Sequence, residues 1–510
     1  MVVFKGPIIP TPKTLDALFE PTMFRDYVEL VSGRLEHYLA DRSVRGLALS
    51  NPPALLETAQ ALTERPSAAS PEADAGRLAA ILDLYIRTGI QLYSPGYMGR
   101  QFSGPLPLAA VVDLAGSILN QPASFYEAAQ LPNIAERIMA DELNRFVGFA
   151  PHRFTMVTTS GGSLANLTAL LAARNDRLPH AWSEGLAGTR QPRPAIAVGA
   201  DAHYSICRAA GILGIGEGQI IRLPIDRERR IDIAAAKRTL EAARRHGLQP
   251  FCLVGSAGST SVGAFDSIDQ LADIAAEQDL WLHIDGAHGA SLLLCDQLRH
   301  RLHGIARADS LTWDAHKLLF VPAACTLLFY KDKDKARGAF RQDASYVFDK
   351  HANGHADYEG AGKNLECTKR AMIMPLWVSW AMYGPAPFAD KIALLCRATT
   401  DAEKIIAGEP DFETLHVPQA NILCFRYRPA GLPESRLGNF QVEIRDRVRA
   451  EGDFFISQVE LDGTAALRLV MMNHRIEPTH VRQLLRQIRK IGLEILAGAE
   501  RAQPEVSQWV

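Results

Sequence analysis

The run Asp314-Ala315-His316-Lys317 has residue types that could bind an aldehyde and a phosphate. It follows a short apolar segment at 310–312 that is typical of a strand. A lysine amine forms an imine with an aldehyde once a desolvated, cationic environment favours its neutral form, and His316 could donate to a phosphate. A lysine alone is more often a solvated surface group, and a histidine alone a structural donor, so other motifs must support this interpretation.

A carboxylate follows the preceding strand-like segment in the run His283-Ile284-Asp285-Gly286-Ala287-His288-Gly289. Asp285 would stand at the carboxyl end of that strand, which is the edge where open α/β sheets bind ligands. In a shielded site it could hold a heterocyclic nitrogen protonated, and the small Gly286 and Ala287 would leave room for a flat ring. The alternative is that Asp285 caps the next helix.

A glycine-rich turn lies upstream, in Thr158-Thr159-Ser160-Gly161-Gly162-Ser163-Leu164-Ala165-Asn166. It follows a strand-like segment and opens an amphipathic helix, so Gly162 and Ser163 would present backbone N–H groups, a hydroxyl and a positive helix dipole to a dianionic phosphate. An ordinary helix cap is the alternative. The spacing matches neither a Walker loop nor GxGxxG.

The elements that must position these motifs are short apolar runs that alternate with amphipathic stretches between about 150 and 331. This pattern predicts a mostly parallel sheet with crossover helices. The motifs would then meet at one edge of the sheet. We expect strands at 154–157, 195–198, 251–254, 280–284, 310–312 and 326–330.

Three units are expected along the chain. Residues 1–90 form a helical N-terminal segment, 91–385 a large α/β domain, and 386–510 a small α+β domain with strands at 420–427, 454–460 and 467–472 and a closing helix at 479–497. The polar stretch 341–366 is expected to be a long functional loop.

Composition narrows the function to small-molecule chemistry. The 510 residues carry a net charge of −2 without a block of like charge, so neither a nucleic-acid surface nor an acidic tail is expected. Seven cysteines without a CxxC pair favour a reduced cytoplasm and no metal site. No membrane span or export signal is expected, because a sustained apolar stretch is absent from the sequence.

The order of the three motifs resembles the group II pyridoxal-phosphate (PLP) decarboxylases, the family of glutamate, aromatic amino-acid, diaminobutyrate and cysteine-sulfinate decarboxylases. The resemblance covers roughly 90–385 well. It implies a fold type I (PLP-dependent transferase-like) large domain with a mostly parallel seven-stranded sheet. It also implies a homodimer with its active site near the interface, which decarboxylates an L-amino acid to an amine and CO2.

The resemblance also implies roles for the motif residues. Asp285 would pair with the pyridine nitrogen of PLP, Ala287 would pack on one ring face, and Lys317 would form the Schiff base. His203, in Asp201-Ala202-His203-Tyr204-Ser205, resembles the histidine that stacks on the opposite face. The phosphate would be held by Gly162, Ser163 and His316.

Substrate-side roles follow from weaker similarities. Arg468 resembles an arginine that binds the substrate α-carboxylate, although a surface salt bridge is the alternative. Tyr97 and Gln101 lie in a segment that relatives share across a dimer interface, and it could equally be a plain turn. A loop tyrosine would protonate Cα, and Tyr358 is closer to the expected position than Tyr346.

Other functions share parts of this pattern. A PLP-dependent aminotransferase, or an oxygen-using enzyme that forms an amine or aldehyde, would have the same cofactor pocket. A scaffold without activity is disfavoured by the intact set of Asp285, His203 and Lys317, and a nicotinamide oxidoreductase by the missing GxGxxG.

Thr368-Lys369 replaces a Gly-Arg pair of many relatives. The likeness to bacterial glutamate and diaminobutyrate branches favours a small polar or acidic amino acid as substrate.

Overall fold

The computed structural model describes residues 16–47, 50–64, 71–186, 192–340, 358 and 360–502. Its centre is a seven-stranded sheet with the strand order β1-β7-β6-β5-β4-β2-β3. Strand β7 runs antiparallel to both neighbours, and the remaining strands run parallel to one another. The strands are β1 Thr155–Thr159, β2 Arg193–Gly199, β3 Ile220–Leu223, β4 Leu248–Ser256, β5 Trp281–Asp285, β6 Ser310–Asp314 and β7 Thr326–Tyr330.

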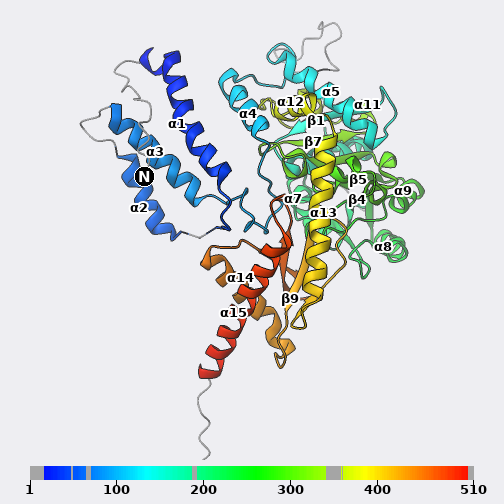
Figure 1. Ribbon diagram of the computed structural model, residues 1–510. Helices are drawn as coiled ribbons and strands as arrows, with labels where there is room; N and C mark the ends of the chain where they lie inside the picture. The colour runs from blue at the N-terminus through cyan, green and yellow to red at the C-terminus, as the bar shows by residue number, and fades with distance from the viewer. Residues whose placement is uncertain are drawn as a thin grey trace, which may run out of the picture.

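Both faces of this sheet are buried under helices (Figure 1). Along β2, Ala195 and Ala197 pack into one apolar core, whereas Ile196 and Val198 pack into the other. A strand that is covered on both faces needs apolar residues at every position, which is why these strands occur as continuous apolar runs in the sequence. The expected mostly parallel seven-stranded α/β fold is confirmed.

α-Helices occur along the whole described part of the chain. They are α1 Pro21–Ala40, α2 Pro52–Thr63, α3 Pro71–Thr88, α4 Pro107–Leu119, α5 Gln130–Val147, α6 Gly162–Arg177, α7 Ser205–Ile212, α8 Ile233–Arg245, α9 Ile268–Glu277, α10 Ala315–Leu318, α11 Lys333–Gly338, α12 Met374–Tyr383, α13 Ala386–Ala407, α14 Glu434–Glu451 and α15 Pro478–Ala502.

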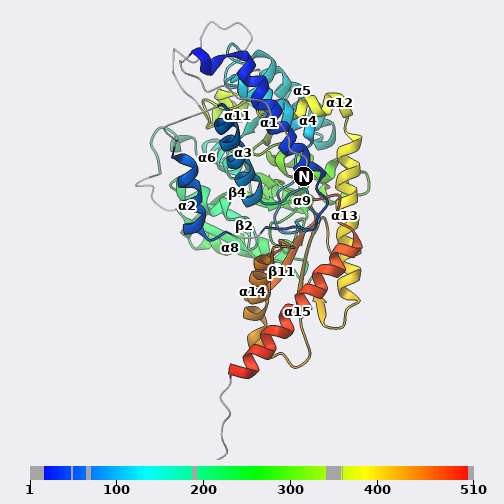
Figure 2. The same cartoon turned by 60° about the vertical axis from the view of Figure 1, so that its left-hand side comes forward.

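A second, antiparallel sheet follows in the C-terminal part of the chain, with the order β10-β11-β9-β8. Its strands are β8 Phe412–Thr414, β9 Ile422–Tyr427, β10 Ser457–Leu461 and β11 Thr464–Val470. Helix α13 runs from the large sheet to this smaller unit (Figures 1 and 2) and contacts both α15 and the short helical turn Gly289–Leu294.

The N-terminal helices α1, α2 and α3 lie beside the large unit (Figures 1 and 2). Helix α1 packs on α3 through Met23 and Leu30, which contact Leu78 and Leu82. Within the described part of the chain, no helix has the length and apolar content that crossing a membrane requires.

Candidate active site

The glycine-rich turn joins β1 to α6. Gly161 has φ = +114°, a conformation that side chains rarely adopt, and α6 begins at Gly162. The first N–H groups of a helix have no partner within it, and in the described part of the chain no side chain caps this helix at Gly161. A Cβ atom on Gly162 would lie 2.9 Å from Oδ1 of Asp314. The turn therefore presents the N–H groups of the first helical turn, and only glycine at position 162 lets the backbone come this close to the Asp314 carboxylate.

Asp285 ends β5 at the same edge of the sheet. Its Oδ2 accepts a hydrogen bond from Nδ2 of Asn166 at 2.9 Å, and its Oδ1 accepts from the backbone N of Ala287 at 3.2 Å. Both donors are neutral, so they orient the carboxylate without cancelling its charge. A protonated ring nitrogen could therefore pair with it.

Asn166 is buried, and its neighbours fix the orientation of its amide. Because Nδ2 donates to Asp285, Oδ1 must accept, and it receives hydrogen bonds from Oγ1 of Thr312 at 2.8 Å and Nε2 of His283 at 3.0 Å. Nδ2 also donates to Oγ of Ser205 at 3.0 Å. Sequence reasoning gave Asn166 no role. One signal was available, since it lies one helical turn after Gly162 among apolar positions.

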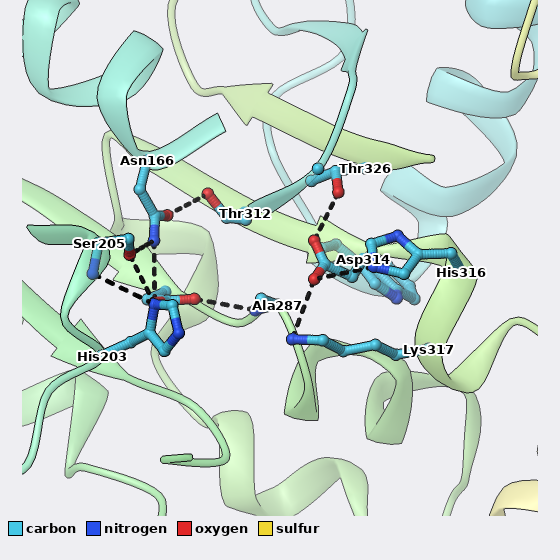
Figure 3. A network of polar contacts seen from close by, with 12 residues as sticks. Asn166, His203, Ser205, Ala287, Thr312, Asp314, His316, Lys317 and Thr326 are labelled. Atoms are coloured by element: carbon cyan, nitrogen blue, oxygen red, sulfur yellow. Dashed lines mark hydrogen bonds and ion pairs between the residues drawn. The ribbon is translucent and has the colours of Figure 1, made fainter. Parts of the chain in front are cut away.

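His203 lies between β2 and α7, and its Nδ1 is 2.8 Å from Oγ of Ser205. Its half-buried ring therefore shares a hydrogen-bond partner with Asn166 (Figure 3). Burial lowers the pKa of His203 below 6.5, and the charge of Lys317 adds to this against the opposing effect of Asp285. A largely neutral, flat imidazole at this position can pack against a ring.

Lys317 lies on α10, directly after β6, and its Nζ is 3.0 Å from Oδ2 of Asp314. The Asp314 side chain is only 3% exposed. Oγ1 of Thr326 donates to it at 2.6 Å, and Nε2 of His316 is 3.6 Å away. Burial alone would raise the pKa of Asp314, but the charges of Lys317 and His316 outweigh it, so the pKa is lowered.

The edge of the sheet thus brings most of the expected site residues together. In the view of Figure 3, Ala287 lies between a group around Asn166 and His203 and a group around Asp314 and Lys317. Gly162 adjoins the second group through Asp314, whereas the Ser163 side chain is exposed. Nδ1 of His316 is 2.9 Å from the backbone O of Cys325, which leaves Nε2 for another partner.

Arg468 contacts the segment that carries Tyr97 and Gln101. Arg468 on β11 is 5% exposed, and it donates through Nε to the backbone O of Ser261 at 3.0 Å and through Nη1 to that of Gly99 at 3.3 Å. Burial lowers its pKa to about 10. Nη2 of Arg468 and Nε2 of Gln101 are buried and lack a partner in the described part of the chain. A buried cation of this kind is costly in free energy unless an anion pairs with it.

Tyr97 is fully buried, stacks on Phe455 and donates to the backbone O of Arg100 at 3.0 Å. Tyr358 is 38% exposed and lies near α5 and the start of β1, with its ring centroid 6.1 Å from that of Tyr126. Within the residues that the structure describes, no hydrogen bond joins either tyrosine to Lys317. Tyr346 lies outside the described residues.

Two further contacts brace the glycine-rich turn. Glu366 accepts from the backbone N of Ser160 at 3.0 Å and from its hydroxyl. Lys369 lies 2.6 Å from Oε1 of Glu136 and donates to both oxygens of Thr158, with the Lys369 side chain 1% exposed. The segment around Thr368-Lys369 therefore carries a buried ion pair under the end of β1.

These groups fit PLP. The helix N-terminus at Gly162 suits a phosphate, Asp285 suits a ring nitrogen, and Lys317 pairs with Asp314, which adjoins Gly162. Comparison with known proteins agrees with this chemistry. Residues 74–428 match the model of the pyridoxal-dependent decarboxylase conserved domain. The chain belongs to the pyridoxal-dependent decarboxylase family.

The chain is similar to an aromatic-L-amino-acid decarboxylase of Bacillus atrophaeus, with 29% identity over 69% of this chain and 72% of the relative. It is also similar to an acidic amino acid decarboxylase of Homo sapiens, with 27% identity over 80% of each chain. The crystal structure of mouse CSAD has the same fold, with a TM-score of 0.84 and 24% identity over 93% of this chain and 99% of that one. The protein is a PLP-dependent carboxy-lyase that converts amino acids to amines.

Proposed function

We propose that this edge of the large sheet is the decarboxylation site and that Lys317 bonds to the aldehyde of PLP. The observation that supports this most is the pairing of Lys317 with Asp314 beside the open helix end at Gly162. Gly162, Ser163 and His316 would hold the phosphate, since they supply N–H donors, a hydroxyl and an imidazole at one helix N-terminus.

PLP, when bound, takes up the electron pair that the breaking bond between Cα and the carboxylate releases. The residues of the chain would orient the cofactor and supply the charges around it. Asp285 would keep the ring nitrogen protonated, because Asn166 and the backbone N of Ala287 hold its carboxylate in place without neutralising it. His203 and Ala287 would keep the ring flat from opposite faces.

Arg468 would bind the substrate carboxylate. Its guanidinium is buried, no salt bridge to it occurs in the described part of the chain, and Nη2 is without a partner. Tyr97 and Gln101 lie on the same segment as Gly99, which Arg468 contacts, so they would shape the substrate side. A small polar or acidic amino acid is the proposed substrate.

The proposed assembly is a cytoplasmic homodimer. Helix α4 exposes Val111 (63%), Ile118 (62%) and Leu119 (67%), which together form an apolar strip that a second copy of the chain could cover. The seven cysteines are free thiols, as a reducing compartment requires. Tyr358 is the residue proposed to protonate Cα.

The test replaces the proposed lysine. Lys317→Ala should lose the visible absorption that PLP gives when it is joined to a lysine, and CO2 release should fall to background. Lys331→Ala is the matched control, because Lys331 is an exposed lysine at the end of β7. Retention of both signals in the Lys317 variant would overturn the assignment.

A second measurement identifies the reaction and the substrate. The wild-type enzyme is offered a panel of acidic, small polar and aromatic amino acids, and CO2, amine, keto acid, aldehyde and peroxide are measured. Equimolar CO2 and amine from an acidic or small polar substrate is the expected result. Keto acid would indicate transamination, and aldehyde with peroxide would indicate oxygen-using chemistry, so either would contradict the proposal.

A further inference from the structure

Asp314 is a buried carboxylate whose function the family assignment leaves open. It ends β6, three residues before Lys317, and its side chain is 3% exposed. A carboxylate at this depth is costly unless a cation and hydrogen bonds compensate it. Its partners therefore show what the residue does.

The nearest cation is the amine of Lys317, whose Nζ lies 3.0 Å from Oδ2 (Figure 3). Thr326 donates to Oδ1 at 2.6 Å, and His316 lies 3.6 Å from Oδ2. The hydroxyl fixes the direction of the carboxylate, and the lysine supplies most of the compensating charge. The pair lies beside Gly162, at the positive end of helix α6.

We propose that Asp314 is a positioning residue that holds Lys317 as an ammonium ion whenever the lysine nitrogen is not bonded to an aldehyde. This inference rests on the proposed role of Lys317. An ammonium ion must lose a proton to solvent before its nitrogen can attack an aldehyde carbon, and the aldehyde oxygen then leaves as water. Asp314 therefore sets how readily the free lysine reacts, and it keeps the released lysine from taking a proton from the substrate.

The test uses the apo-enzyme and pyridoxal, an aldehyde without a phosphate, so that effects on phosphate binding do not enter. The rate at which the visible adduct forms is measured between about pH 7 and pH 10. The carboxylate 3.0 Å from Nζ stabilises the ammonium form, so Asp314→Asn should form the adduct at least about tenfold faster at pH 7. The pH profile should move to lower pH.

Other titratable groups near Asp314 do not confuse this profile. They lie on the segment before α7, after β5, on α10 and before β7, and they are His203, His288, His316, Lys317 and Cys325. Burial lowers the pKa of His203 and His288 and raises that of the Cys325 thiol. Imidazoles ordinarily change charge near pH 6.5, below the range measured, so a shift of the profile between about pH 7 and pH 10 reports on the amine.

Two further variants make the result unambiguous. Thr326→Val removes the hydroxyl but keeps the charge of Asp314, so the profile should stay at the wild-type pH; a shift as large as that of Asp314→Asn would overturn the proposal. Asp314→Ser also removes the charge and should shift the profile if Asp314→Asn does not fold.

The same assay separates this proposal from the assignment of Lys317. An unshifted profile in a folded, uncharged variant would refute the role of Asp314 alone. An adduct of the same rate and absorption in Lys317→Ala would instead refute the proposed function, because the reacting amine would then be another lysine.

Discussion

Replacing Lys369 with methionine should destabilise the protein more than any surface substitution. Its ammonium group donates to Glu136 at 2.6 Å, to Oγ1 of Thr158 at 2.9 Å and to the Thr158 carbonyl at 3.2 Å, and the two charged side chains are 1% and 8% exposed. Methionine would leave the Glu136 carboxylate buried without a cation. Removing one partner of such a pair costs about 3–5 kcal/mol.

The free energy of unfolding of the apo-protein is measured by urea denaturation, and the first transition is compared between variants. Lys237→Met is the matched control, because Lys237 pairs with Glu277 at 2.8 Å while the two side chains are 41% and 55% exposed. Its loss should cost less than about 1 kcal/mol. The double variant Lys369→Met, Glu136→Leu should recover most of the loss, since no charge then remains buried.

Two results would refute this reasoning. One is a loss of stability in Lys369→Met as small as that in the exposed control, and the other is a double variant no more stable than the single one. The substitution has a functional consequence as well, because Thr158 lies on β1 three residues before Gly161. We expect Lys369→Met to weaken PLP binding without touching the site, and a fluorescence titration with PLP measures this.

Three more predictions use individual residues. Burial lowers the pKa of His288 to about 3, so the contribution of the neutral imidazole to stability is complete above about pH 6.5 and is lost as the pH falls from there toward about pH 3. His288→Gln should therefore reduce the slope of unfolding free energy against pH in this range by about 1.4 kcal/mol per pH unit; an unchanged slope in urea denaturation contradicts this. Gly162→Ala would place Cβ 2.9 Å from Oδ1 of Asp314 and should weaken PLP binding at least about tenfold. Gly116→Ala is the control, because the space around Gly116 is open, and this variant should bind PLP normally. Asn166→Leu removes the amide that orients Asp285 and should lower the free energy of unfolding, measured with urea, by about 2–4 kcal/mol. The absorption spectrum of bound PLP should also change, and a normal spectrum at wild-type stability contradicts this role of Asn166.

The sequence predicts the large sheet well because its central strands are buried on both faces. The apolar segments expected at 280–284 and 326–330 match β5 and β7 within one residue. The strands β3 and β8 were not expected, because each lies at the edge of its sheet, is only 4 or 3 residues long, and carries a charged residue, Arg222 or Glu413. A short edge strand has no second apolar face to mark it.

The candidate site divides in the same way. Residues at strand ends, such as Asp285 and Lys317, could be placed from the sequence because the carboxyl ends of parallel strands share one edge. The contacts that hold these side chains in place could not be predicted from the sequence. Asn166 reaches Asp285 only because α6 crosses the sheet, and a buried pair such as Lys369 with Glu136 joins segments that have no common pattern in the sequence.

The two carboxylates of the site differ in their partners, and this difference determines how a cofactor can lie. Asp285 accepts hydrogen bonds from neutral donors, so its charge remains available to a cation. Asp314 already pairs with a lysine and lies beside the positive end of α6. A flat molecule with a protonated nitrogen and a phosphate is therefore bound best with the nitrogen at Asp285. The α6 N-terminus near Gly162 would hold the phosphate, because the opposite orientation would place two anions together at Asp285. Lys317 would then be the lysine available to the aldehyde.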